Sequence, residues 1–169
     1  MDDLRYPVGR FECPSTHDKV DRNGWLEEMA ELPAQVRLAV GALPEGGLDR
    51  PYRDGGWTAR QVVHHLADSH MNSYIRFRLA LTEDCPTIKP YDEAAWAELA
   101  DARSAPVDLS LSLLGSLHAR WVTLLRSLAT NDWTRRLTHP ESGELDLHTM
   151  LGLYAWHGRH HLAHIRAIR

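Results

Sequence analysis

The sequence lacks the features that mark a secreted, membrane-spanning or disulfide-rich protein. Its two cysteines, Cys13 and Cys85, lie far apart and form no CxxC motif, so free thiols in a reducing cytosol are expected. No apolar run approaches the roughly 20 residues that a membrane span needs. The N-terminal "MDDLRYPVGR" begins acidic and has no apolar segment of the kind found in signal peptides. These absences predict a cytoplasmic protein that does not enter the membrane.

An excess of positive charge is also missing. The net charge is −4 with neutral histidines and the pI is about 6.2, which is no footprint for binding nucleic acid or an anionic membrane. The 169 residues are 43% hydrophobic, a length and composition that fit one domain over residues 1–169. What the sequence has in excess is histidine, with eleven residues that gather in two segments.

Four long segments have the apolar spacing of amphipathic helices: about 25–43, 58–81, the stretch after Pro106, and the stretch from about Leu147 to the C-terminus. Thr58 and Gln61 form a T-x-x-Q capping box, and Asp108 is expected to cap the third helix. "YDEAAWAELA" predicts a short helix capped by Asp92, and a Glu-Ser-Gly turn between two alternating runs indicates a small hairpin. The first twenty or so residues read as an arm. An all-α four-helix bundle follows, with a short extra helix and a possible hairpin in its connections.

The last helix separates its histidines into two pairs. His157 and His161 lie four residues apart within a stripe whose other members are apolar or aromatic, from Met150 to Ile168, so they occupy positions that face the core. His160 and His164 lie on a flanking face, suited to an interface or to supporting a ligand. The stripe favours His157 and His161 over His160 and His164 as a metal-binding pair. Histidines that only hydrogen-bond to their neighbours remain the alternative.

A metal site needs at least one more ligand, and "VVHHLADSH" offers three. Spacing favours His65 over His64 only mildly, and His70 lies one to two turns further on. Three histidines would leave a coordination position open for water or substrate. His118, on the third helix, is a candidate fourth ligand or a residue that supports a ligand, and the favoured expectation is that it only hydrogen-bonds within the bundle.

Four segments carry a resemblance to a known family: "YPVGRF", "PYRDGGWTARQVVHHLADSHMNSYIRFRLALTE", "PYDEAAWAEL" and "YAWHGRHHLAHI". They resemble the YfiT-type metal-dependent hydrolases of the DinB superfamily. The resemblance implies a homodimer of four-helix bundles, each holding one divalent metal ion with three histidines. Those residues map to His65, His157 and His161. Zinc is the first expectation for the ion, with nickel or manganese also compatible.

The resemblance also implies an activity. The superfamily includes thiol S-transferases, and YfiT-like proteins are similar to the group that conjugates bacillithiol to small electrophiles, with the metal activating the thiol as thiolate. The alternative is a hydrolase that uses a metal-bound water, although no HExxH motif is present. A third possibility is a metal-storing or structural site in an interaction protein.

Four further residues are candidate helpers at the site. Arg60 and Arg159 are candidates to pair with carboxylates of a thiol cosubstrate, with a solvated surface position as the alternative. Asp68, three residues after His65, is the candidate general base of the hydrolase, with an acceptor for a ligand imidazole or a surface acid as the alternatives. Tyr154, one turn before His157, could contact a bound ligand, with packing in the core as the alternative.

Overall fold

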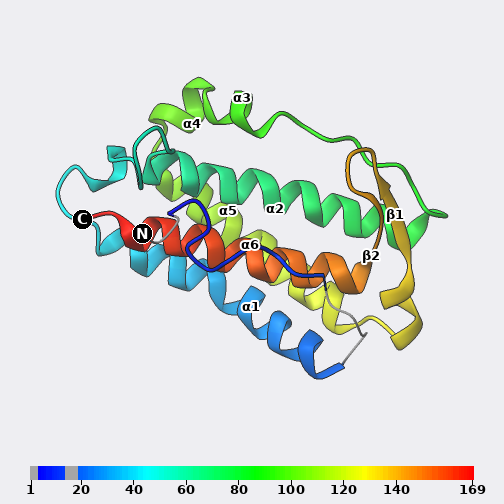
Figure 1. The fold of residues 1–169 in the computed structure, drawn as a ribbon. Coiled ribbons are helices and arrows are strands. Elements are labelled where there is room, and N and C mark those ends of the chain that lie inside the picture. The colour runs from blue at the N-terminus through cyan, green and yellow to red at the C-terminus, as the bar shows by residue number, and fades with distance from the viewer. Residues whose placement is uncertain (1–3, 14–18) are drawn as a thin grey trace.

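A computed structural model describes residues 4–13 and 19–169 of the chain, and its four long helices form a bundle (Figure 1). These helices are α1 (Lys19–Gly41), α2 (Ala59–Thr82), α5 (Val107–Arg126) and α6 (Leu147–Ala167). Helix α1 packs against α5 and α6, and α2 packs against the same two helices from the other side. The predicted bundle is therefore confirmed, and α2 and α6, which carry most of the histidines, are neighbours in it.

The connections carry short elements. These are the 3-10 helices η1 (Gly47–Asp49) and η2 (Thr130–Thr134), the helices α3 (Glu93–Ala97) and α4 (Ala100–Ser104), and the strands β1 (Arg136–His139) and β2 (Gly143–Asp146). The two strands form the expected antiparallel hairpin, with Arg136 opposite Asp146. Gly143 has a φ of 78°, a left-handed conformation that glycine adopts at little cost in a tight turn. Thr138 on β1 exchanges backbone hydrogen bonds with Pro86 and Ile88, which ties the hairpin to the segment after α2.

Helix starts follow the local signals in the sequence, with one exception. The Thr58–Gln61 capping box is present, Asp92 accepts from the Ala95 N–H at 2.9 Å, and Asp146 caps α6. The prediction that Asp108 caps α5 is wrong. The helix begins directly after Pro106, so Asp108 lies in its first turn, where a negative charge is favourable beside the helix N-terminus.

The interior has two apolar clusters, one nearer the hairpin and one nearer the η1 loop. The first includes Phe77, Trp121 and Leu151, and the second includes Val36, Leu66, Leu114 and Ile165. Several histidines are buried with them, which is costly unless each ring nitrogen finds a partner.

The described part of the N-terminal arm, residues 4–13, contains no helix and lies along α6 (Figure 1). The Trp156 indole N–H donates to the Gly9 carbonyl at 3.1 Å, and the Phe11 ring packs on Trp156. Tyr6 packs on His160 in the same way. The arm thus covers the flanking face of α6, and residues 1–3 and 14–18 of the predicted arm lie outside the described part of the chain.

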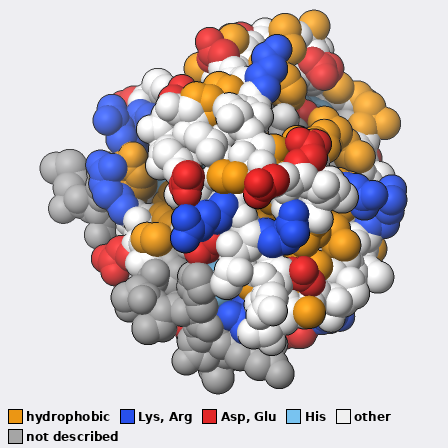
Figure 2. Space-filling model, turned by 90° about the vertical axis from the view of Figure 1, so that its right-hand side faces the viewer, with side chains coloured by type: hydrophobic (Ala, Val, Ile, Leu, Met, Phe, Trp, Pro, Cys, Tyr) orange, Lys and Arg blue, Asp and Glu red, His pale blue; other side chains and the backbone are white. Residues whose placement is uncertain are grey.

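The outer surface at the hairpin end carries acidic and basic side chains interspersed with apolar ones (Figure 2). Across residues 4–13 and 19–169, none of the helices is both long enough and apolar enough to cross a membrane.

Candidate metal centre

His65 on α2 and His157 and His161 on α6 converge in the bundle interior. Each offers one ring nitrogen, and these nitrogens all lie within 4.8 Å of one another. The ring centroids are 5.3 Å apart for His65 and His157, 4.7 Å for His65 and His161, and 4.5 Å for His157 and His161. His65 and His161 are buried, while His157 keeps part of its surface exposed. We call these three residues the histidine triad.

The spacing of the triad matches the requirements of a metal ion. Tetrahedral zinc with Zn–N bonds of 2.0–2.1 Å places its ligand nitrogens about 3.3 Å apart. Nε2 of His65 lies 3.3 Å from Nε2 of His157, which equals this separation and is also within hydrogen-bonding distance when no cation is bound. These residues therefore fit a divalent cation by the kind of atom that they offer and by the separation of those atoms.

The protonation state of the triad also suits a cation. Burial lowers the pKa of His65 to about 4, with the neighbouring His160 and His164 adding to the effect. Burial lowers the pKa values of His157 and His161 well below the usual range. All three imidazoles are therefore neutral at pH 7, the form in which histidine binds a metal.

The packing around the triad comes from the loop before α2. The Trp57 ring lies 4.7 Å from the His65 ring and is stacked with the His161 ring at 6.4 Å. Trp57 directly precedes the helix cap Thr58, so the start of α2 fixes its position. This indole shields one side of the triad and leaves the partly exposed His157 edge on another.

His64 points away from the triad. Its Nδ1 lies 2.7 Å from the Ser110 hydroxyl and its Nε2 lies 3.2 Å from the Ala105 carbonyl, so both nitrogens are occupied on the α4–α5 side. His118 hydrogen-bonds within the bundle as expected, to the Met29 carbonyl and to His70. Of the α2 histidines, only His65 joins a group of possible metal ligands among the described residues.

A second group of three histidines, His160, His161 and His164, shares one residue with the triad. Their ring nitrogens also lie within 4.8 Å of one another and all three side chains are buried. His164, however, uses Nε2 to bond the Leu4 carbonyl at 3.1 Å, and its Nδ1 faces Nδ1 of His161 at 3.4 Å. If His161 gives Nε2 to the triad, its Nδ1 holds the proton. The two groups therefore compete for His161.

Asp68 is the only carboxylate on α2 or α6, the two helices that carry the triad. It is partly buried, and burial raises its pKa from 3.8 to about 6, with Asp101 as the second cause. A pKa near neutrality suits a group that exchanges protons at physiological pH. Tyr154 is buried with its ring 5.5 Å from the His157 ring and packs on Trp121, so it is part of the core beside the triad.

The two candidate arginines are held by other residues of the chain. Arg60 bonds both carboxylate oxygens of Asp49, the nearer at 2.8 Å, and the Ala105 carbonyl at 2.9 Å. Arg159 forms an ion pair with Glu28 on α1. These contacts give both guanidinium groups a role in joining elements of the fold.

One residue near the candidate site had no signal in the sequence. Tyr91 lies in the segment between α2 and α3, where its buried phenol lies near Ser69 and Asp68 of α2. Burial is the main reason that the pKa of Tyr91 is raised. A tyrosine in an irregular loop follows no periodicity, so only the folded chain could place it there.

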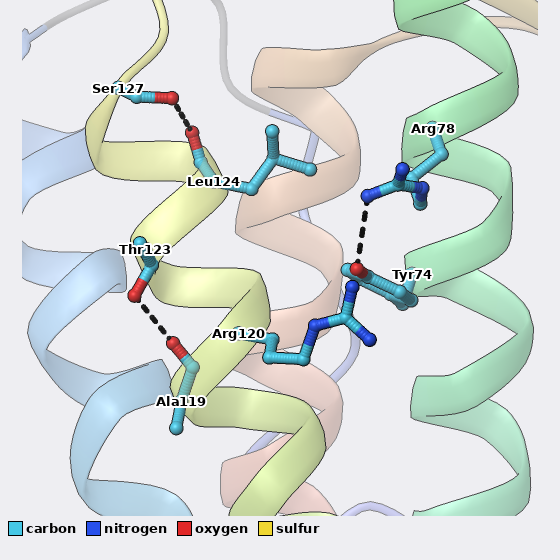
Figure 3. A pocket seen from close by; sticks show the side chains of 7 residues that line it. All are labelled: Tyr74, Arg78, Ala119, Arg120, Thr123, Leu124 and Ser127. Carbon is cyan, nitrogen blue, oxygen red and sulfur yellow. Dashed lines mark hydrogen bonds between the residues drawn. The ribbon is translucent and has the colours of Figure 1, made fainter.

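A separate groove lies between α2 and α5, away from the triad. It is lined by Tyr74 and Arg78 of α2 and by a run of α5 and its C-terminal cap that includes Arg120 and Ser127 (Figure 3). Arg78 donates to the Tyr74 hydroxyl at 3.1 Å, and both Arg78 and Arg120 lie over the Tyr74 ring. None of the triad histidines lines this groove.

Comparisons with known proteins connect this arrangement with a family. Residues 28–165 match the model of the DinB superfamily. Proteins of Bacillus cereus strain B4264 and Bacillus thuringiensis subsp. konkukian, provisionally named metal-dependent hydrolases, are each 56% identical over 171 residues, which covers 100% of this chain and 97% of theirs.

The solved structure of YfiT from Bacillus subtilis, described as having an unusual four-helix bundle topology and assigned provisionally to the metal-dependent hydrolases, aligns with a TM-score of 0.93 and 50% identity. The alignment covers 96% of this chain and 94% of that one. The family match, the full-length identity and the shared bundle agree, and the chain therefore belongs to the DinB superfamily and is YfiT-like.

Proposed function

We propose that this protein is a metal-dependent hydrolase whose metal ion is held by His65, His157 and His161. The observation that carries the proposal is the 3.3 Å separation between Nε2 of His65 and Nε2 of His157, within a group of three neutral, mostly buried imidazoles. The provisional hydrolase names of the Bacillus relatives support the same reaction class.

When bound, a divalent cation such as zinc supplies Lewis acidity at an open coordination position and lowers the pKa of a bound water. The chain's own residues hold three nitrogens at the separation that the cation requires. Trp57 packs against His65 and His161, and we propose that a substrate approaches from the side of the partly exposed His157. Zinc is our first expectation, with nickel or manganese as alternatives.

Asp68 is proposed as the general base. It follows His65 by three residues, so the two side chains are neighbours on the α2 surface. Because its pKa is raised to about 6, the carboxylate is ionised at pH 7 and still basic enough to accept a proton from an attacking water. The buried Tyr91 hydroxyl lies near Asp68 and has no hydrogen-bond partner in the described chain, so we propose it as a donor to a substrate oxygen.

Thiol transfer is the second candidate function. Neither cysteine of the chain lies at the triad, so the protein itself supplies no thiol there. Cys85 contacts Thr138 on the hairpin at 3.6 Å, and Cys13 is exposed near the start of α6. A sulfur nucleophile at this site would therefore come from solution, and bacillithiol with a small electrophile remains our prediction for it.

One experiment separates the two reactions. The metal-loaded protein is incubated with a panel of aryl esters and amides, and separately with bacillithiol, glutathione or cysteine and monochlorobimane. The hydrolase proposal expects cleavage that EDTA abolishes and that falls at least 100-fold in His157→Ala and His161→Ala, with His139→Ala on the hairpin as the matched control. Conjugate formation without any cleavage would replace hydrolysis by thiol transfer. Cleavage that persists in both triad variants would reject the site.

A further inference from the structure

We propose that two chains of hydrogen-bonded imidazoles, each ending on a main-chain carbonyl, fix the tautomers of His157 and His161 so that both present an unprotonated Nε2 to the cation. The inference rests on the proposed metal centre and assigns positioning roles to His70, His118 and His164.

The first chain, which we call the His157 chain, begins at the Met29 carbonyl on α1. Nδ1 of His118 lies 2.6 Å from this oxygen, and because a carbonyl only accepts, the His118 proton must be on Nδ1. Nε2 of His118 is then bare and accepts from Nδ1 of His70 at 2.8 Å. Nε2 of His70 is bare in turn and accepts from Nδ1 of His157 at 3.1 Å. The last link leaves Nε2 of His157 without a proton.

The direction of this chain has no freedom as long as its rings are neutral, since each neutral imidazole has one donor and one acceptor. His70 and His118 are almost fully buried, at 0% and 1% exposure, and burial lowers the pKa values of both below the usual range. Their rings are stacked 4.9 Å apart, and both pack edge-on against Trp121. Three helices besides α6 therefore determine how one histidine of α6 is protonated.

The second chain, which we call the His161 chain, begins at the Leu4 carbonyl of the N-terminal arm. His164 donates to this oxygen from Nε2 at 3.1 Å, so its Nδ1 is bare. Nδ1 of His161 lies 3.4 Å from Nδ1 of His164. Because Nδ1 of His164 has no proton, Nδ1 of His161 must be the donor of this hydrogen bond. The Tyr52 ring stacks on His164 at 3.9 Å and holds the ring in plane. Nε2 of His161 is again left bare, and the arm gains a role at the metal centre.

His65 differs from the other two because no described residue hydrogen-bonds to its Nδ1. Its Nε2 lies 3.3 Å from the bare Nε2 of His157, so without a cation His65 is expected to hold its proton on Nε2 and donate it across this gap. Binding a cation at the triad requires that nitrogen to be bare. His65 is therefore the one triad ring that must change tautomer when the cation binds.

The direct test is the long-range nitrogen–proton NMR spectrum of the full chain labelled with ¹⁵N-histidine, recorded without metal and with one equivalent of zinc. His157 and His161 are expected to show a proton on Nδ1 in both states, and His65 is expected to move its proton from Nε2 to Nδ1. A proton on Nε2 of His157 or His161 in the metal-free protein would overturn the proposal.

Paired variants test the positioning role through zinc affinity, measured by competition with a chelator. His118→Gln keeps one amide donor for Met29 and one acceptor for His70, whereas His118→Leu keeps neither; His164→Gln and His164→Leu form the same pair for the arm. The leucine variants are expected to lose roughly 10–100-fold in affinity, and the glutamine variants are expected to retain most of it. Equal losses of zinc affinity in both members of a pair would show that the residue acts only by packing and would reject its role in fixing the tautomer.

The outcomes for the site and for the chains are distinguishable. A wild-type protein that binds no zinc would reject the proposed metal centre, yet its metal-free spectrum would still report the tautomers of His157 and His161. A protein that binds zinc with the wrong tautomers would reject only the chains. Zinc binding that depends on His160 and His164 and not on His65 and His157 would show that the second group is the site, and would overturn the His161 chain.

Discussion

Replacing Asp68 with asparagine should stabilise the folded protein above pH 7 while removing most of its hydrolytic activity. Burial raises the pKa of Asp68 from 3.8 to about 6, so the folded state holds this proton more tightly than the unfolded chain does. The resulting stabilisation is complete below pH 3.8 and is lost as the pH rises through 6. Above that pH the ionised carboxylate opposes folding, and the neutral amide of asparagine does not.

The size of the effect follows from the same shift. A full conversion of the two pKa values into free energy gives about 3 kcal/mol, but Asp68 is only partly buried, and screening by solvent reduces the figure to about 1 kcal/mol. For a chain of this length, that corresponds to a melting temperature about 2–4 °C higher at pH 8. At pH 4, where Asp68 is largely protonated, the difference between the variant and the wild type should be much smaller.

The activity should change in the opposite direction. In the wild type, kcat/KM should rise with pH through an inflection near 6, and Asp68→Asn should lose this inflection and roughly 10²–10⁴-fold in rate. Asp101→Asn is the matched control, because it removes the second cause of the raised pKa of Asp68 and should move the inflection to lower pH without abolishing activity. Unchanged activity in Asp68→Asn would refute the assignment. A gain in stability over the wild type that is smaller at pH 8 than at pH 4 would also refute it.

Three stability predictions concern the frame around the site and are read by thermal unfolding. Gly158→Ala would place a Cβ atom 2.6 Å from a methyl of Leu32 at the α1–α6 contact and should cost about 1–3 kcal/mol. Because Leu32→Ala removes this clash, the double variant should lose less stability than the sum of the two single variants. Gly115→Ala, on α5 with open space around it, should instead stabilise by about 0.5–1 kcal/mol, and a loss there would contradict the packing described. Thr58→Ala removes the α2 cap next to Trp57 and should cost about 1 kcal/mol, whereas a neutral result would mean that the capping box contributes nothing.

Local features of the sequence were sufficient for most of the fold. The start of α2 depends on Thr58 and Gln61, which lie three residues apart, and the inward position of His157 and His161 depends on the apolar stripe of a single helix. Asp108 does not cap α5 because the helix already begins directly after Pro106, two positions earlier, so two local signals compete at this end.

The support around the triad could not be predicted, because it joins residues that are distant in the sequence. The His157 chain links His118 to Met29 across 89 positions and to His70 across 48. Leu4 contributes only its main-chain carbonyl, so no pattern of side chains in the sequence predicts that the N-terminal arm contacts His164. Residue type and helical period indicate which face a histidine occupies, while its hydrogen-bond partners depend on how whole helices pack.

The most direct test of the metal centre is the number of zinc ions bound per chain, measured by elemental analysis and calorimetry after complete removal of metal. The triad geometry predicts one ion for the wild type and for the His139→Ala control, and loss of tight binding in His65→Ala, His157→Ala and His161→Ala, each confirmed as folded by circular dichroism. Tight binding of one ion by a chain that lacks all three of these histidines would contradict the account.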